Sequence, residues 1–100
     1  MKTSIQEIDG RLVVTLSGEL DTAAAAEAEA ALKPLLESNG RDVVIDCTEL
    51  EYIASSGLRI LLSILKKVKA DGGRVTLKNV NEVIRDVLEL TGFIKIFDFE

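Results

Sequence analysis

The sequence YIASSGLR, residues Tyr52–Arg59, lies between the hydrophobic run Asp42–Asp46 and an apolar stretch that continues to about Ala70. Two adjacent serines and a glycine in this position are typical of a turn from a strand into a helix. The first N–H groups of a helix are unpaired and its dipole is positive there, which favours a hydroxyl cap and equally favours a phosphate. The stretch therefore predicts a candidate switch at Ser55 or Ser56, with helix capping as the simpler interpretation.

The chain on either side of this turn alternates between strand and helix patterns. Asp9-Gly10 predicts a hairpin turn, Asp21 offers an N-cap to an alanine-rich helix, Pro34 predicts a kink in that helix, and Gly18 is expected in a turn. The predicted elements, in chain order, are strands Thr3–Ile8 and Arg11–Ser17, helix Ala23–Leu32 continuing to Glu37 or Ser38, strand Val43–Ile45, helix Ser55–Ala70, strand Arg74–Leu77, helix Asn81–Leu90 and a final strand or extended segment within Ile94–Phe99.

This order predicts an α/β fold. Strands that are separated by helices usually pair in parallel through right-handed crossovers, whereas the opening hairpin must be antiparallel. We therefore expect a mixed, mostly parallel sheet of four to five strands, with three main helices packed against it.

Composition excludes several classes of function. The 100 residues are 47% hydrophobic and 29% charged, which predicts one globular domain over residues 1–100. A net charge of −5 with scattered Lys and Arg argues against nucleic-acid binding. No apolar stretch is long enough for membrane insertion, so we expect a cytoplasmic protein. With no His and only Cys47, expected to be a packed thiol, metal sites and histidine-based catalysis are not expected.

The helix that follows the serines has an apolar face and a polar face. A projection at 100° per residue places Ser56, Arg59 and Ser63 opposite the leucine-rich face. Ile60 falls beside the polar residues. Shielding by a neighbouring element is the favoured interpretation of Ile60; if it were exposed, these four residues would form a docking surface that begins at the serine turn.

Four segments, in this order, resemble the STAS domain family and, within it, the single-domain bacterial anti-sigma factor antagonists. They are Leu16–Asp21 (LSGELD), Val43–Leu50 (VVIDCTEL) ahead of Tyr52-Ile53, Ser55–Leu58 (SSGL) and Leu88–Phe97 (LELTGFIKIF). The resemblance covers nearly the whole chain and implies a STAS-like fold of the α/β type predicted above.

The resemblance also implies a partner switch that is not an enzyme and needs no cofactor. The unphosphorylated chain would bind an anti-sigma factor that is also an ATP-dependent serine kinase, which would release a sigma factor. Phosphorylation of Ser55 would end that association, and a serine phosphatase would restore it; Ser56 is the alternative acceptor. The implied partner-binding residues are Asp21, Ser55, Ser56, Gly57, Arg59, Ile60 and Ser63.

Some of these residues also have purely structural interpretations. Asp21 is favoured as a helix cap over a kinase contact. Gly57 either leaves room for a partner's backbone or fits a crowded first helical turn. The chain departs from the family pattern at Ala54, where many phosphorylated members carry an acid, and at Arg59, where a second glycine is common.

Two other functions are compatible with the residues. The first is an unmodified STAS docking subunit of a larger assembly, such as a lipid-transport complex, and Ala54 favours it modestly. The second is a small enzyme or nucleotide-binding protein that uses the helix start as a phosphate site, although the sequence has no glycine-rich phosphate loop ending in Lys and Ser or Thr.

Overall fold

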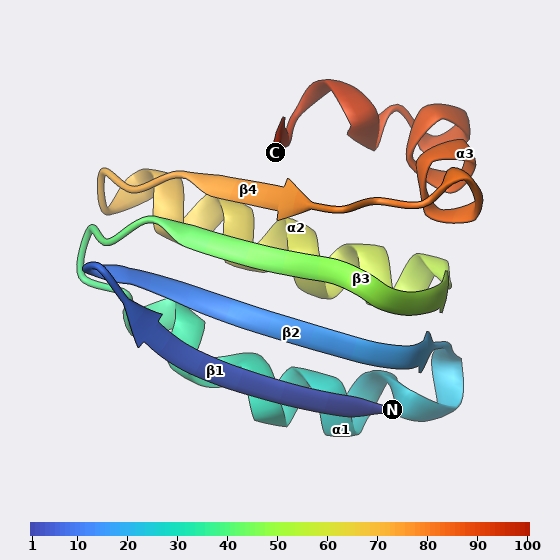
Figure 1. Cartoon of the computed structure of the whole chain (residues 1–100), viewed down its shortest axis with the longest axis horizontal. Coiled ribbons are helices and arrows are strands. Elements are labelled where there is room, and N and C mark those ends of the chain that lie inside the picture. Colours follow the sequence, from blue (N-terminus) through green and yellow to red (C-terminus); the bar gives the residue numbers. More distant parts are fainter.

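The computed structural model describes residues 1–100 as a five-stranded sheet with helices against it (Figure 1). The strands follow one another across the sheet in chain order, β1-β2-β3-β4-β5. The elements are β1 (Lys2–Ile8), β2 (Arg11–Leu20), α1 (Thr22–Leu32), the 3₁₀ helix η1 (Lys33–Glu37), β3 (Val43–Ile53), α2 (Ser55–Ala70), β4 (Val75–Lys78), α3 (Glu82–Thr91), the 3₁₀ helix η2 (Phe93–Lys95) and β5 (Asp98–Phe99).

The antiparallel part of the sheet is the predicted hairpin of β1 and β2. Asp9 and Gly10 both have positive φ, at 53° and 79°, which is the conformation of a tight turn between twisted strands. Along β2, Leu12, Val14 and Leu16 are buried while the residues between them are only partly covered. This period of two places one face of the strand on the core.

The remaining strand pairs are parallel, as the alternation of strands and helices predicts. Strand β3 lies at the centre and runs to Ile53, well beyond the predicted Val43–Ile45. Its second half mixes buried with exposed acidic residues, so it lacks the continuous apolar run that marks a central strand. The expectation that Gly18 serves a turn is wrong, because Gly18 lies inside β2, with φ of 100°, at an irregularity of the β2–β3 register.

The helices begin and end close to where the sequence predicts. Helix α1 stops at Leu32 and continues as the 3₁₀ helix η1, since Pro34 lacks the N–H that an α-helix needs. Asn81 caps α3 by accepting the Ile84 N–H at 2.9 Å, and its amide donates to the Leu50 carbonyl of β3 at 2.9 Å. Within the segment Ile94–Phe99, predicted as a strand or extended, Ile94 and Lys95 belong to the 3₁₀ helix η2 instead, and only β5 is a strand.

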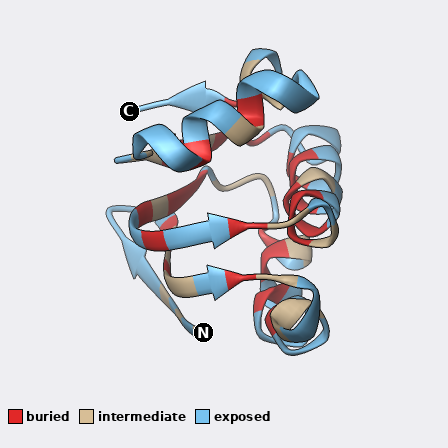
Figure 2. Cartoon of the chain, turned by 90° about the vertical axis from the view of Figure 1, so that its right-hand side faces the viewer, coloured by how far each residue is buried: buried red, intermediate tan, exposed pale blue.

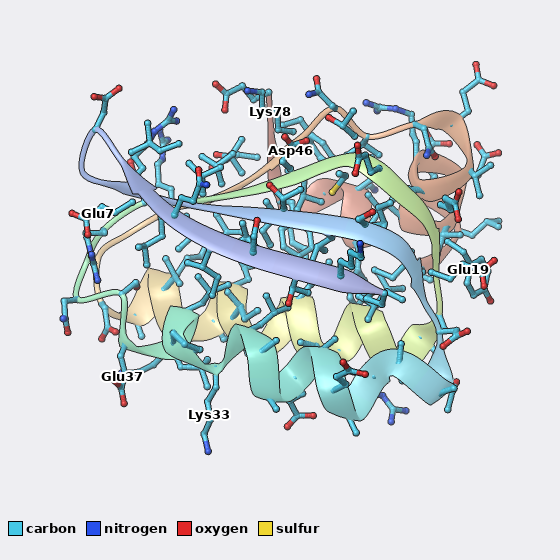
Figure 3. The ribbon with its side chains drawn as sticks, turned by 60° about the horizontal axis from the view of Figure 1, so that its bottom comes forward. Glu7, Glu19, Lys33, Glu37, Asp46 and Lys78 are labelled. Carbon is cyan, nitrogen blue, oxygen red and sulfur yellow. The ribbon has the colours of Figure 1, made fainter.

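Helices α1 and α2 lie side by side on one face of the sheet and turn their buried residues toward it (Figure 2). The opposite face is polar where Asp46 of β3 pairs in register with Lys78 of β4 (Figure 3). Partial burial raises the pKa of Asp46, but hydrogen bonds from Thr48 and the charge of Lys78 outweigh it, so the pKa lies below its ordinary value. No helix of the structure has both the length and the apolar content needed to cross a lipid bilayer.

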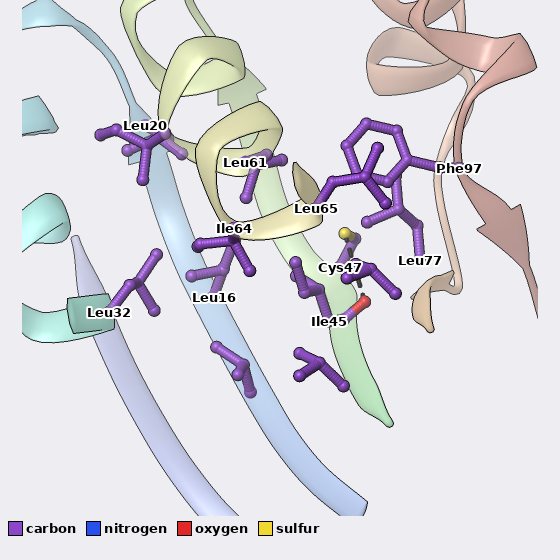
Figure 4. Close-up of a cluster of buried hydrophobic side chains, with 14 of the residues drawn as sticks. Leu16, Leu20, Leu32, Ile45, Cys47, Leu61, Ile64, Leu65, Leu77 and Phe97 are labelled. Carbon is purple, nitrogen blue, oxygen red and sulfur yellow. Dashed lines mark hydrogen bonds between the residues drawn. The ribbon is translucent and has the colours of Figure 1, made fainter. Parts of the chain in front are cut away.

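The core lies between α2 and the sheet and contains Cys47 (Figure 4). The Cys47 side chain is 1% exposed, and its Sγ lies 3.6 Å from the Ile45 carbonyl oxygen. Burial and the nearby Asp46 carboxylate raise the pKa of the Cys47 thiol from 9.0 to about 12. The expectation of a packed rather than reactive thiol is confirmed, because thiolate is the reactive form.

The raised pKa of Cys47 predicts a loss of stability in alkaline solution. The unfolded chain releases the thiol proton above about pH 9 while the folded chain keeps it to about pH 12. In that window the folded state binds more protons, so the free energy of unfolding falls as pH rises, by at most about 1.4 kcal/mol per pH unit. Urea denaturation between pH 8 and 11 should show this fall relative to Cys47→Ala, whereas parallel pH profiles would contradict it.

Candidate functional site: the first turn of α2 and the groove beside it

Helix α2 starts at the carboxyl end of β3 without a side-chain cap. The N-cap residue is Ala54, whose backbone is extended, and its N–H donates to the Leu20 carbonyl of β2 at 2.9 Å. Ser55 and Ser56 are therefore the first two helical residues, and neither occupies the capping position. The capping interpretation of the serines is wrong, because Ala54 occupies the N-cap position and no side chain caps the helix.

The two serines differ in their surroundings. Ser55 is exposed, and its hydroxyl forms no hydrogen bond. Ser56 is partly buried, and its Oγ lies 3.5 Å from the Thr22 Oγ1 at the start of α1. Of the two hydroxyls, that of Ser55 is the more accessible to a modifying enzyme.

Gly57 is buried where α2 meets the sheet. A Cβ at this position would lie 2.6 Å from Leu20 Cγ and 3.1 Å from Ile53 Cγ1, and both of these side chains are themselves fully buried. The structure thus supports the packing interpretation of Gly57, since only a glycine lets the first turn of α2 approach the strand ends this closely. Gly57 lies beneath the surface that Ser55 occupies.

Asp21 caps α1, as favoured from the sequence. Its carboxylate accepts the Ala24 N–H at 2.8 Å. Asp21 also lines a shallow hollow together with Glu19 and Glu51. These acids gather at the end of the sheet where α1 and α2 begin, and Figure 3 shows Glu19 at this end. The first turn of α2 therefore lies at an acidic end of the molecule.

A groove of about 280 Å³ separates α2 from α1 and η1. Ser56, Arg59 and Ser63 line it from α2, which are three of the residues predicted to contact a partner. Ile60 lies at its floor and is 8% exposed, so the favoured prediction that a neighbouring element shields it is confirmed. The other lining residues are Ala25, Glu29, Leu32, Lys33, Leu36 and Ile64.

The groove is apolar at its floor and carries charges at its rim. Arg59 is exposed and takes part in none of the ion pairs of the structure, whereas Glu29 and Lys33 stand on the opposite wall. The Ser63 hydroxyl donates to the Arg59 carbonyl at 3.0 Å and so bonds within its own helix. Arg59 is the one cation on the α2 wall of the groove.

Glu29 and Lys33 are not among the residues singled out from the sequence. They could have been found by helical spacing, because Ala25, Glu29, Lys33 and Leu36 recur at intervals of three and four residues on one face. What the sequence could not provide is the pairing of this face with α2, which depends on how both helices lie on the sheet.

The sequence and the fold match one known family. A model of the STAS domain matches residues 2–100. The chain belongs to the STAS domain family. Its relative BtrV of Bordetella bronchiseptica, described as an anti-sigma factor antagonist, is 36% identical over 97 residues, which are 97% of this chain and 84% of that protein.

Solved structures show the same architecture. The crystal structure of an anti-sigma factor antagonist from Mycobacterium paratuberculosis superposes with a TM-score of 0.82 at 31% identity, over 98% of this chain and 83% of that one. The Bacillus protein SpoIIAA is similar in fold in its unphosphorylated form, with a TM-score of 0.74 at 20% identity over 99% and 87% of the two chains. Its phosphorylated form also gives 0.74, at 21% identity over 99% and 91%.

The packing of Gly57 can be tested by adding one methyl group. Gly57→Ala should destabilise the fold by about 1 kcal/mol, because overpacking costs about 1–3 kcal/mol and exceeds the gain of about 1 kcal/mol in helix propensity. The free energy of unfolding in urea measures this. Ser63→Ala, at an exposed position of α2, is the matched control and should leave stability within about 0.5 kcal/mol. A more stable Gly57→Ala protein would show that Leu20 moves aside at little cost.

Proposed function

We propose that this chain is an anti-sigma factor antagonist whose binding is switched by phosphorylation of Ser55. In its unphosphorylated form it binds an anti-sigma factor that is also a serine kinase, and this binding frees a sigma factor and so regulates transcription. The observation that carries the proposal is the exposed, unbonded Ser55 hydroxyl in the first turn of α2. It occurs in a chain whose relatives are anti-sigma factor antagonists.

The proposed modification is a phosphoryl transfer from ATP, which the kinase holds. The Ser55 oxygen forms a bond to the γ-phosphorus, the bond to the β,γ-bridging oxygen breaks, ADP leaves, and the hydroxyl proton passes to a base of the kinase. A serine phosphatase reverses the change by hydrolysis. This chain supplies only the accepting hydroxyl and its surroundings, so we assign it no catalytic residue and no cofactor.

Electrostatics supports a switch at this position. A phosphate adds about −1.5 to −2 charges, and it would stand at an end of the molecule where Glu19, Asp21 and Glu51 already gather. Inside the chain, the positive end of the α2 dipole offsets part of this charge. The cost would instead fall on the interface with the partner, which would have to bury the phosphate where it covers Ser55. A coupling of about 3 kcal/mol would weaken its binding more than a hundredfold.

The switch needs no refolding of the chain. SpoIIAA has been solved in both its unphosphorylated and phosphorylated forms, and both resemble this chain equally, with a TM-score of 0.74. This supports a mechanism in which phosphate changes the charge and shape of an interface on an otherwise constant fold. The proposed interface includes Ser55, the α2 wall of the groove and the nearby Asp21, and we place the protein in the cytoplasm, where such a kinase would act.

A second candidate function rests on Ala54. Where an acid precedes the serine pair in many phosphorylated relatives of the family that this sequence resembles, Ala54 provides none. The same surface would then serve as an unmodified docking site in a larger assembly such as a lipid-transport complex. The two functions differ in whether Ser55 ever carries phosphate.

Phosphorylation is tested on protein isolated from the native host with phosphatases inhibited, across growth and stress conditions. Intact-mass and phosphopeptide analysis should find one phosphate on Ser55 whose occupancy changes with condition. Ser55→Ala should abolish it, whereas the matched variant Ser56→Ala should keep it. Unmodified Ser55 in every condition, with full peptide coverage, would favour the docking subunit.

Binding is tested against each anti-sigma factor kinase of the host, by calorimetry with purified proteins. Ser55→Ala should bind as tightly as the unmodified wild type and stay bound in the presence of ATP. Ser55→Asp should bind at least about tenfold more weakly, because a carboxylate carries part of the phosphate's charge. Equal affinity of Ser55→Asp and wild type for the kinase would count against Ser55 as the switch.

A further inference from the structure

Arg59 lies one helical turn after Ser55 on the exposed side of α2. Both residues are exposed, and their spacing of four residues makes their side chains neighbours on the helix surface, with Cβ atoms about 5–6 Å apart. Ser56 lies three residues before Arg59 and lines the groove with it. A phosphate on the Ser55 hydroxyl would therefore be formed within reach of a guanidinium group.

The direction of the Arg59 side chain favours this contact. Long side chains of α-helices point back toward the N-terminus and cover the turn that precedes their own Cα. For Arg59 that turn contains Ser55 and Ser56. From this general tendency we expect the Arg59 side chain to extend toward the modification site.

Arg59 is also free of competing ion pairs. The ion pairs of the structure join Arg11, Arg41, Lys67 and Arg74 to acids, and Arg59 is in none of them. Glu29, on the opposite wall, is the acidic residue that lines the same groove as Arg59. The other charged side chains that line the groove or the adjacent acidic hollow are Glu19, Asp21, Glu51 and Lys33.

We infer that Arg59 is a positioning residue that captures the phosphate of phosphorylated Ser55 in an intramolecular ion pair across one turn of α2. The inference rests on the proposed modification of Ser55 and adds the group that receives it. A guanidinium group binds phosphate through two parallel N–H donors, which fixes the position of the phosphate as well as offsetting its charge. The phosphate is thereby held at the mouth of the groove between α1 and α2.

This pairing changes the groove in two ways. It places the phosphate beside the α2 wall of the groove. It also pairs the positive charge of Arg59 with the phosphate, so that this charge is no longer available to a partner. One modification would then add negative charge to the proposed interface and neutralise the positive charge of Arg59. The family commonly has glycine at this position. The ion pair between Arg59 and the phosphate is therefore a feature of this chain and not part of the family pattern that supports Ser55 as the acceptor.

The test uses the full chain with phosphoserine incorporated at position 55 during translation, so it needs no kinase. ³¹P NMR titration measures the second pKa of the phosphate, which an adjacent guanidinium group lowers by stabilising the dianion. We expect this pKa to be lower in the wild-type background than in Arg59→Gln by roughly half a unit, the size typical of an exposed ion pair. Arg59→Lys should restore part of the difference.

The matched control is Lys66→Gln, which removes one exposed cation from the same helix, 11 residues after Ser55. At a rise of about 1.5 Å per residue, Lys66 lies out of reach of the phosphate, and its loss should leave the phosphate pKa unchanged. Circular dichroism checks that each variant is folded. Equal pKa values in wild type and Arg59→Gln would overturn the inference, and so would an equal change in Lys66→Gln.

The outcome is separable from that of the proposed function. Failure to find phosphate on Ser55 in the host would count against the modification, while the titration would still report whether Arg59 pairs with an installed phosphate. If Ser55 is phosphorylated in a regulated way but the phosphate pKa is the same in wild type and Arg59→Gln, the proposed switch stands and the role of Arg59 in it is rejected.

Discussion

The close contact of Gly57 with Leu20 and Ile53 is the constraint on which the rest of the site depends. It joins the first turn of α2 to the ends of two neighbouring parallel strands, with no space for a Cβ between them. The Ala54 N–H, bonded to the Leu20 carbonyl, fixes the same junction through the backbone. Together these contacts determine where α2 starts and which of its sides faces outward.

The exposure of Ser55 follows from that junction. Since Gly57 and Leu58 face the core, Ser55 and Arg59 must face away from it on a helix with 3.6 residues per turn. The position is uncapped because Ala54, at the N-cap, has no hydroxyl or carboxylate to offer. An ordinary capping residue would satisfy the first N–H groups from within the chain. Here no side chain caps the first N–H groups of α2, so they remain available to a group attached to the first turn or to a partner.

The groove between α1 and α2 lies next to this exposed first turn. Helix α1 begins at its Asp21 cap and ends where Pro34 starts the 3₁₀ helix η1, and it packs beside α2 on the same face of the sheet. The resulting groove has a shielded apolar floor at Ile60 and a charged rim. An exposed hydroxyl, a cation one turn away and an apolar floor thus lie close together. In the function that we propose, this surface meets a partner whose binding responds to charge.

The sequence by itself determined the α/β order, the hairpin at Asp9-Gly10, the bounds of α2 and the position of the serine turn, because these depend on local patterns of burial, turn chemistry and helix periodicity. Only the tertiary structure decided the length of β3, the interior role of Gly57, the uncapped state of the serines and the groove between α1 and α2. Each of these is a contact between segments far apart in the chain. Local propensity cannot specify such contacts, because they arise from how the helices settle on the sheet.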